Sequence, residues 1–521
     1  MIQRQKSICS VYISNHGADL SSISPLRFLL SLFLHLYLNT SNKKLTNSTN
    51  RGLKCYPIVG GLPDFLRNRH HFLDWTTEVL RNSPHNTLVY WQPGNVHVIM
   101  TVNPLNVEYM LKTNFDNYPK GDHFMTLLQD LVGQGFFNCD GDLWKLQRRT
   151  ASSEFSTKSL RNFFMDNVKT ELSTRLVPIL KRASTTQLVM DLQDVFERFA
   201  FDNICKLAFN VDADCLGGDA SAGAGFMRAF DAATMHSFGR FLHAFNFLWK
   251  LKKKFNMGSE LVLKQSIAIV HEFADDIIRS RMKTKVKGNA EDLLSRFIAV
   301  EEISPKFLRD IILSFMIAGR DTTSSALTWF FWLLSLNPEV ELKILNELEM
   351  IRARYGKNTG DTHSFEELRD MHYLHAAISE SLRLYPPVPI DMKVCLKDDM
   401  LPDGTFAGAG WFVTYNAYAM GRMESIWGRN FHEYLPERWL ENGIYRPENS
   451  FRFSVFHAGP RICLGKDMAY IQIKSVAALV IERFVIKVQD NDECPQHLQS
   501  LTLRMKGGLH VKVKERFVDI I

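Results

Sequence analysis

The sequence predicts a mainly α-helical fold of the α+β class, in which a small amount of sheet is separate from the helices. Helical patterns dominate from Pro104 almost to residue 390. Strand patterns are few and lie at the two ends of this helical stretch, at residues 88–101 and beyond residue 390. With 45% hydrophobic and 23% charged residues, the composition is that of a globular protein.

The N-terminal segment, residues 1–55, is expected to hold a weak membrane anchor at about residues 23–38, followed by a linker. The apolar run Phe28–Leu38 is shorter than the ~20 residues that a membrane-spanning helix requires. A helix lying in the membrane interface is the alternative. Residues 56–521 then form one globular domain. Basic residues after the run would keep this domain on the cytosolic side: Lys43, Lys44, Arg51 and Lys54.

Within that domain, the segments 88–91 and 96–101 predict a β-hairpin across Pro93-Gly94-Asn95. Residues 394–414 and 501–513 each predict a strand pair with a glycine-containing turn. Residues 226–255 are rich in Phe, His and Lys, which is typical of a mobile lid at a membrane surface. An ordinary amphipathic helix pair explains that pattern equally well.

A long helix is predicted from Ser304-Pro305, where a capping hydroxyl precedes a proline at the first turn, to Leu336. Its middle reads Ala318-Gly319-Arg320-Asp321-Thr322-Thr323. The glycine costs about 1 kcal/mol relative to alanine, and adjacent threonines compete for backbone carbonyls. A helix weakened there can open a groove for dioxygen, with Asp321 and Thr322 as proton donors. A tolerated glycine beside two back-bonding hydroxyls is the alternative.

Apolar residues 374–384 predict a helix that stops at Pro386-Pro387 and carries Glu380 and Arg383 on one face. Amid so many Leu and Ile the pair is expected to be partly buried, which requires further hydrogen bonds. Arg438 is the expected third member. We interpret this trio as architectural rather than catalytic.

Trp144 and Arg148 lie four residues apart and therefore one above the other on a helix face. Their N–H groups can donate to one carboxylate. A cation–π pair on the surface is the alternative interpretation.

Residues 456–465, Phe-His-Ala-Gly-Pro-Arg-Ile-Cys-Leu-Gly, place Cys463 in a short loop ahead of a helix pattern. A thiolate at a helix start is stabilised by unpaired N–H groups and the positive dipole end. An aromatic ring can cover the sulfur, glycines let the backbone approach something flat, and a guanidinium can bind a carboxylate. The loop supplies each of these groups: Phe456, Gly459, Arg461 and Gly465. A protein can hold a haem iron through sulfur in this way, although a lone cysteine is more often a small buried hydrophobe.

The four motifs occur in the order Trp-x-x-x-Arg, Ala-Gly-x-Asp-Thr, Glu-x-x-Arg and the cysteine loop. Together they resemble the signatures of the cytochrome P450 superfamily across residues 144–465, and the likeness extends from about residue 56 to 516. The resemblance implies the cytochrome P450 fold, with a large helical domain, a small β-rich domain and a long central helix over haem b (iron protoporphyrin IX).

The resemblance also implies roles for single residues. Cys463 becomes the axial thiolate ligand of the iron, and Asp321 and Thr322 become the oxygen-activating acid–alcohol pair. The propionates are assigned to Trp144, Arg148 and Arg461. The structural triad is Glu380, Arg383 and Arg438. Many relatives carry His or Arg shortly after the Glu-x-x-Arg helix to reach a propionate, whereas residues 386–390 offer neither.

Thiolate donation to haem favours O–O cleavage, so the resemblance implies insertion of oxygen from O2 into an unactivated C–H bond. Electrons would come from NADPH–cytochrome P450 reductase at the endoplasmic reticulum membrane. Four basic residues are candidates for the docking face: Lys145, Arg149, Lys466 and Lys474. A solvated charged face is the alternative for each of them. The mild net charge of +6 does not indicate nucleic acid as a partner, and the other seven cysteines are expected to be reduced thiols.

Four short stretches of the sequence resemble the plant fatty-acid omega-hydroxylase clan. Within that clan the chain is most similar to the branch with jasmonoyl-isoleucine 12-hydroxylases and fatty-acid omega-hydroxylases. This likeness rests on residues 374–380, 386–391, 418–423 and 502–509. It implies a small amphipathic carboxylate whose alkyl tail is oxidised at or near its tip, which requires a narrow apolar channel. By family position the channel is lined by Phe315, Ala318, Val388, Ile390 and Leu501. Core packing would explain the same apolar residues.

Three functions stay open. Jasmonoyl-isoleucine 12-hydroxylation in hormone catabolism is preferred, and omega-hydroxylation of fatty acids in cutin or defence lipid metabolism is the alternative. The third belongs to a different class, a non-oxygenating haem-thiolate isomerase or a haem sensor. Such isomerases do not need the acid–alcohol pair, so its presence argues against them.

Overall fold

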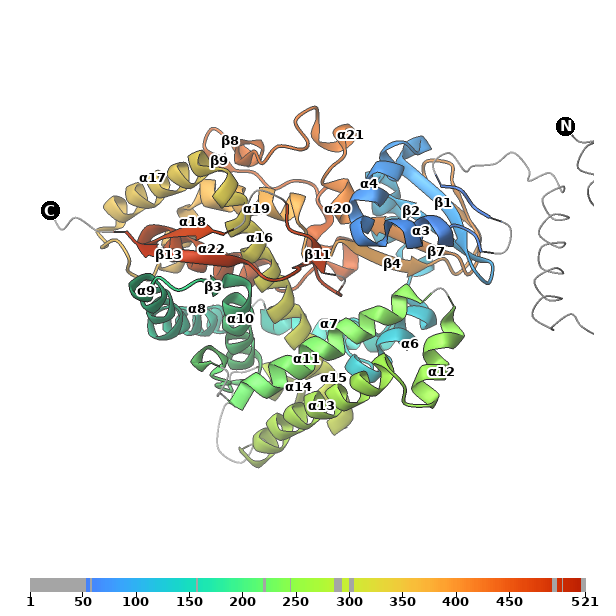
Figure 1. Cartoon of the computed structure of the whole chain (residues 1–521), viewed down its shortest axis with the longest axis horizontal. Helices are drawn as coiled ribbons and strands as arrows, with labels where there is room; N and C mark the ends of the chain where they lie inside the picture. Colours follow the sequence, from blue (N-terminus) through green and yellow to red (C-terminus); the bar gives the residue numbers. More distant parts are fainter. Residues whose placement is uncertain are drawn as a thin grey trace, which may run out of the picture.

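The computed structural model describes residues 53–516 except 57–58, 156–157, 219–221, 244, 285–292, 299–303, 490–493 and 499. A large helical part lies beside a smaller part in which strands β1, β2, β4 and β7 pack with two helices (Figure 1). The predicted α+β class is confirmed. The anchor expected at residues 23–38 lies outside the described residues, among which no helix is long and apolar enough to span a membrane.

A central helix crosses the large helical part (Figure 1). It consists of α15 (Pro305–Met316), a π-helical turn (Ile317–Asp321) and α16 (Thr322–Leu336). The Ser304 hydroxyl accepts from the Phe307 N–H and caps its start, as the sequence predicts. The expected weak point is a π-helical turn, a distortion frequent at functional sites. Gly319 has a second reason to lack a side chain, because a Cβ there would lie 2.6 Å from Ile204 of the neighbouring helix.

Twelve described helices precede the central one, and several of them surround it. Helix α10 is almost entirely buried and packs along α16. The twelve are α3 (Leu62–Asn68), α4 (Phe72–Arg81), α5 (Pro104–Glu108), α6 (Gly121–Val132), α7 (Gly141–Phe155), α8 (Lys158–Glu171), α9 (Val177–Thr186), α10 (Leu192–Phe209), α11 (Ala222–Gly239), α12 (Asn246–Lys254), α13 (Ser259–Thr284) and α14 (Leu293–Ile298).

Helices α19 and α22 complete the buried core on the other side of the central helix. The helices that follow it are α17 (Pro338–Tyr355), α18 (Phe365–Asp370), α19 (His372–Leu384), α20 (Ala417–Met420), α21 (Glu424–Trp427) and α22 (Lys466–Arg483). The predicted helix at residues 374–384 is therefore confirmed. In the segment 226–255 the described residues form α11, a short 3-10 turn and α12, which is the helix-pair interpretation.

The larger sheet has the order β1-β2-β7-β4. The hairpin β1–β2 is antiparallel as predicted, β2 pairs in parallel with β7, and β7 pairs antiparallel with β4. Its strands are β1 (Thr87–Gln92), β2 (Val96–Thr101), β4 (Ile390–Val394) and β7 (Phe412–Asn416). Two small pairs are separate from this sheet, β5 (Asp399–Met400) with β6 (Phe406–Ala407), and β8 (Leu440–Glu441) with β9 (Ile444–Tyr445), of which the second pair packs on α19.

The strand pair predicted within residues 501–513 is wrong. Strand β12 (Arg504–Met505) pairs with β11 (His497–Leu498), whereas β13 (His510–Glu515) pairs with β10 (Phe484–Val488) and β3 (Met190–Asp191). Gly507 and Gly508 both have positive φ angles, of 87° and 84°, and turn the chain away from β12. The longer strand β10 then satisfies the β13 backbone groups.

Candidate haem site

The loop that carries Cys463 is fixed by backbone contacts on both sides. The Cys463 N–H donates to the Phe456 carbonyl at 2.8 Å. Gly459 has φ +64° and approaches η4 (Tyr109–Thr113) so closely that a Cβ would lie 1.9 Å from the Leu111 carbonyl oxygen. Glycine is therefore required at residue 459 by both conformation and space. Helix α22 begins immediately after Gly465, as the sequence predicts.

The Cys463 thiol is accessible and is nevertheless surrounded by protein. Burial therefore raises its pKa. The N–H of Gly465 and the charges of Arg148 and Lys466 act in the opposite direction and favour the sulfur anion. An accessible sulfur inside the protein, with an N–H donor and cations beside it, suits ligation of a metal in a bound cofactor. The donor set therefore fits a haem iron.

Trp144 and Arg461 lie face to face beside this loop. The Arg461 guanidinium carbon is 4.4 Å from the centroid of the Trp144 ring. One Arg461 nitrogen also donates to the Cys139 carbonyl at 3.1 Å and pairs with the Asp140 carboxylate. Arg148 lies on the same helix, α7, and its charge acts on the Cys463 thiol. The structure thus brings the three residues that were predicted to bind the propionates together around the cysteine loop.

Four further charged or titratable residues, which the motifs did not indicate, lie in or beside the cysteine loop. Asp391 of β4 lies 2.7 Å from the Lys120 ammonium, 2.9 Å from the Lys393 ammonium and 3.2 Å from His457 Nε2. His457 belongs to the cysteine loop itself. Burial lowers the pKa of Lys393 to about 7 and the pKa of His457 to about 4, against the attraction of the carboxylate.

The charges of this region fit an anionic ligand. Two carboxylates, Asp140 and Asp391, lie among four cations, which are Lys120, Arg148, Lys393 and Arg461. The cations outnumber these carboxylates when Lys393 is protonated, and an anionic group such as a propionate beside it would favour that protonated form. In the sequence, only the Asp391-x-Lys393 spacing indicates this charge cluster, because residues two apart in a strand point to the same side.

Replacing Lys393 by methionine is expected to loosen haem by about tenfold or more, because a hydrogen bond to a charged group contributes roughly 1.5–3 kcal/mol. The measurement is the rate at which haem passes from the loaded protein to excess apomyoglobin. Lys397→Met removes an exposed ammonium from the same segment and should leave this rate unchanged. Equal rates for the two variants would assign Lys393 to packing alone.

Asp321 and Thr322 lie at the junction of the π-helical turn and α16. The Thr322 hydroxyl donates to the Ala318 carbonyl at 2.6 Å, which is the back-bonding that the sequence left as an alternative. Asp321 is buried, and burial raises the pKa of its carboxyl, against the attraction of Arg320. A raised pKa favours the protonated carboxyl, which is the form that can donate a proton.

Glu380, Arg383 and Arg438 form one buried network. Both oxygens of Glu380 accept from Arg383, at 2.7 and 2.8 Å, and one also accepts from Arg438 at 3.3 Å. Arg383 donates further to three carbonyl groups, those of Gly421, Phe431 and Glu433. The Trp439 indole N–H and the Leu435 backbone N–H also donate to Glu380. The pair is fully buried rather than partly buried, and its contacts are with backbone and neighbouring side chains.

The residues predicted to line a channel have different environments. Phe315 is packed in a cluster with Phe136 and Phe297, in agreement with the core-packing alternative. Ala318, Ile390 and Leu501 are half-buried and Val388 is exposed. The segments that carry them converge, because the Leu503 N–H donates to the Pro387 carbonyl and the Leu503 carbonyl accepts from Ser325 and Trp329 of α16.

One of the four residues predicted to form the reductase-docking face does not lie on the surface. Lys474 is buried, donates to the Leu368 carbonyl, and has its pKa lowered by burial to about 8. It therefore cannot belong to an exposed face. Lys145 and Arg149 are exposed on α7, and Lys466 lies over the Phe456 ring, 5.7 Å from its centroid.

The fold and the cysteine loop together define a haem-thiolate protein. Residues 51–513 match the family description "Cytochrome P450". The chain is 51% identical over 461 residues to "Cytochrome P450 CYP94D108" of Paris polyphylla, which covers 88% of this chain and 91% of the relative. It is 47% identical to "Cytochrome P450 94C1" of Arabidopsis thaliana, over 85% and 89%, and 43% identical to "Cytochrome P450 94B3" of the same plant, over 96% and 98%.

The chain belongs to the cytochrome P450 family. A solved structure described as the cytochrome P450DA heme domain has the same fold, with a TM-score of 0.74 over 89% of this chain and 97% of that chain at 20% identity. The predicted fold, the haem b cofactor and the class of monooxygenase are confirmed by these matches. When bound, haem b supplies the dioxygen chemistry of this class.

Proposed function

We propose that the enzyme hydroxylates the terminal or near-terminal carbon of a carboxylate-bearing alkyl substrate, with jasmonoyl-isoleucine as the first candidate and 12-hydroxylation as the reaction. Cys463 holds the haem iron, and Asp321 with Thr322 supplies protons to oxygen. The cationic groups around the cysteine loop hold the propionates. The structural triad fixes the segments that support the loop.

The single observation that carries the alkyl-tail proposal is the convergence of apolar segments beside the π-helical turn. Pro387 and Leu503 are joined by a backbone hydrogen bond, and the Leu503 carbonyl is bound by α16. Half-buried Ala318, Ile390 and Leu501 belong to these segments. An apolar wall at this place favours a tail that presents its tip to the haem and excludes water.

The test is incubation of reductase-reconstituted enzyme with jasmonoyl-isoleucine, dodecanoic acid and oleic acid in parallel, followed by product analysis. The 12-hydroxy product from jasmonoyl-isoleucine, at a higher kcat/KM than for the fatty acids, supports the proposal. Omega-hydroxylation of the fatty acids alone supports the cutin or defence alternative. NADPH-dependent oxygen consumption without either product would favour a different substrate class, and its absence would favour the non-oxygenating isomerase or sensor.

We also propose that the enzyme lies on the endoplasmic reticulum membrane with this domain in the cytosol. Helix α12 supports the membrane contact, because exposed apolar side chains and lysines share it and its flanks. The apolar ones are Phe245, Phe247, Leu248, Leu251, Phe255 and Met257, and the basic ones are Lys250, Lys252, Lys253 and Lys254. An exposed apolar surface bordered by lysines fits the interface of an anionic bilayer.

The double substitution Phe247→Ser and Leu251→Ser is expected to weaken binding to vesicles by at least about tenfold, because each apolar side chain contributes roughly 1.5–3 kcal/mol when buried. Cosedimentation with vesicles of neutral and of anionic lipid measures it. Leu342→Ser with Met350→Ser removes two equally exposed apolar side chains from α17, at the opposite end of the molecule (Figure 1). Equal binding by both variants would place the membrane contact outside α12.

The proposed electron donor is NADPH–cytochrome P450 reductase. Lys145 and Arg149 are exposed on α7, the helix that also carries Trp144 and Arg148. Exposed cations on this helix lie near the haem site and suit an acidic partner. A reductase titration of reduction rate at low and high ionic strength tests this proposal, since steering between opposite charges weakens with salt.

A further inference from the structure

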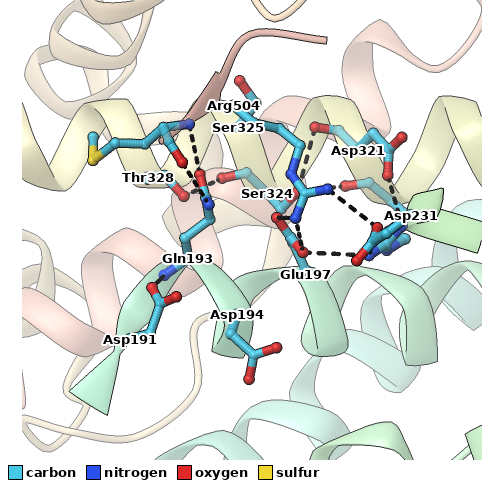
Figure 2. Close-up of polar contacts among 12 residues, drawn as sticks. Asp191, Gln193, Asp194, Glu197, Asp231, Asp321, Ser324, Ser325, Thr328 and Arg504 are labelled. Carbon is cyan, nitrogen blue, oxygen red and sulfur yellow. Dashed lines mark hydrogen bonds and ion pairs between the residues drawn. The ribbon is translucent and has the colours of Figure 1, made fainter. Parts of the chain in front are cut away.

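A buried network of charges joins four separate parts of the chain beside the central helix (Figure 2). Glu197 comes from α10, Asp231 from α11, Arg320 and Asp321 from the π-helical turn, and Arg504 from β12. In Figure 2 the Arg504 side chain reaches from the C-terminal segment to the carboxylates of Glu197 and Asp231. Asp194, one turn before Glu197, points away from the network.

The two guanidinium groups bridge the three carboxylates. Arg504 lies 2.7 Å from Glu197 and 3.2 Å from Asp231. Arg320 lies 2.6 Å from Asp231, 3.3 Å from Glu197 and 3.1 Å from Asp321. Arg320 is fully buried, and Glu197 and Asp321 are nearly so. Asp321 is therefore connected through Arg320 to both other carboxylates.

The charges of the network do not balance when every group is ionised. Three carboxylates face two guanidiniums, and a guanidinium does not lose its proton in a protein. One uncompensated negative charge inside the protein is costly. Uptake of one proton by the carboxylates removes that charge. The proton belongs to the coupled set rather than to one residue.

The network extends from solvent to the acid–alcohol pair. Asp231 keeps 33% of its side chain exposed, whereas Asp321 is buried directly before Thr322. Within the described residues, Arg320 Nε and Arg504 Nε are buried N–H groups without a hydrogen-bond acceptor. Such groups are positions where proteins hold ordered water. Water molecules bound at these N–H groups can carry protons between the carboxylates. The guanidinium groups hold the carboxylates in place but do not transfer protons themselves.

We propose that Glu197 is a proton-relay residue for oxygen activation, acting through Asp321. A proton enters from solvent at Asp231, passes to Glu197 and Asp321, and leaves from Asp321 toward the Thr322 hydroxyl and the oxygen site. Each departing proton is replaced by one from solvent, so the network returns to its starting state. The electrons of the reaction come separately from the reductase. Arg320 and Arg504 fix the three carboxylates at relay distance.

The pH dependence follows from the groups that face Glu197, which are Arg320, Arg504, Asp231 and Asp321. Burial raises the pKa of Glu197 to about 7, against the attraction of the two guanidiniums. Because the carboxylates share one proton, the network as a whole is protonated below about pH 7 and loses that proton as the pH rises. Product formed per NADPH consumed is expected to be highest below this value and to fall above it.

The decisive variant is Glu197→Gln, which keeps the size of the side chain but leaves two carboxylates with two guanidiniums and no need for a proton. Glu171 also has its pKa raised to about 7 by burial, so the network is identified by the infrared difference between the wild type and Glu197→Gln. That difference is expected to hold the carbonyl band of a protonated carboxyl titrating near pH 7. Product per NADPH should fall by about tenfold, a modest share of what general acid–base groups contribute, with the difference released as peroxide. Glu197→Asp should restore both.

Asp194→Asn is the matched control. Asp194 lies on the same helix but pairs with Arg198 at 2.7 Å outside the network, so this change should leave the band and the coupling as in the wild type. Coupling is measured with dodecanoic acid and with jasmonoyl-isoleucine. If neither is hydroxylated, the proposed substrate fails while the infrared titration, which needs no substrate, still decides the relay. A difference spectrum between the wild type and Glu197→Gln that holds no protonated-carboxyl band, or one whose band does not titrate, would overturn the proposal.

Discussion

Replacing Cys463 by serine is expected to abolish the thiolate-type carbon monoxide spectrum and to lower monooxygenation by about a thousandfold or more, equivalent to about 4 kcal/mol of lost transition-state stabilisation. The physical reason is that a serine hydroxyl at neutral pH is neutral and donates far less electron density to iron than a thiolate. The Gly465 N–H, Arg148 and Lys466 all favour an anion at this position. Difference spectra of the reduced protein and product formation measure the two effects.

Cys494→Ser is the control for this experiment, because Cys494 is another exposed cysteine and its thiol contacts Tyr385. It should keep both spectrum and activity. Haem content must be compared between the variants, so that a protein without haem is not counted as one with a changed ligand. A Cys463→Ser protein that retains the thiolate spectrum would show that another residue ligates the iron.

Replacing Arg383 by methionine is expected to destabilise the folded protein by about 3–5 kcal/mol, the cost of breaking a buried ion pair by removal of one partner. Glu380 would be left buried without its main charge partner, and the Phe431 and Glu433 carbonyls would lose their donor as well. Little haem-loaded protein should accumulate. Urea unfolding of the purified holoprotein measures the change.

Arg446→Met is the matched control for Arg383→Met. Arg446 also pairs with a glutamate, Glu441, at 2.8 Å, but both side chains are more than half exposed. Exposed pairs contribute roughly 0–1 kcal/mol, so this variant should unfold nearly as the wild type does. If the two variants were equally stable, the buried triad would not be the structural support inferred above.

The sequence was most informative where the chemistry is carried by adjacent residues. The cysteine loop and the Glu-x-x-Arg helix could be assigned because short spacings determine which side chains meet, through a turn or along one helix face. The weak centre of the long helix was predicted from Gly319 and its neighbouring threonines, and it is a π-helical turn. The close contact of Gly319 with Ile204 could not be predicted, because it depends on how α10 packs.

The cations beside the cysteine loop show what short motifs cannot predict. Residues 386–390 offer no His or Arg, but Lys393 lies three residues beyond them, and the fold brings it to Asp391 together with Lys120 and His457 from two other segments. Only the Asp391-x-Lys393 alternation within β4 was a local signal. Lys474 shows the opposite error, since a lysine assigned to an exposed face is buried against the Leu368 carbonyl.

By itself, the sequence indicated the cysteine proposed to ligate the iron, the class of chemistry, the long central helix and the Glu-x-x-Arg helix, because each depends on side chains that are neighbours along the chain. Tertiary structure alone decided the pairing of β12 with β11 and the meeting of Glu197, Asp231, Asp321 and Arg504. Those contacts join segments up to about three hundred residues apart. Their energies depend on burial and on opposing charges, which exist only once the chain has folded.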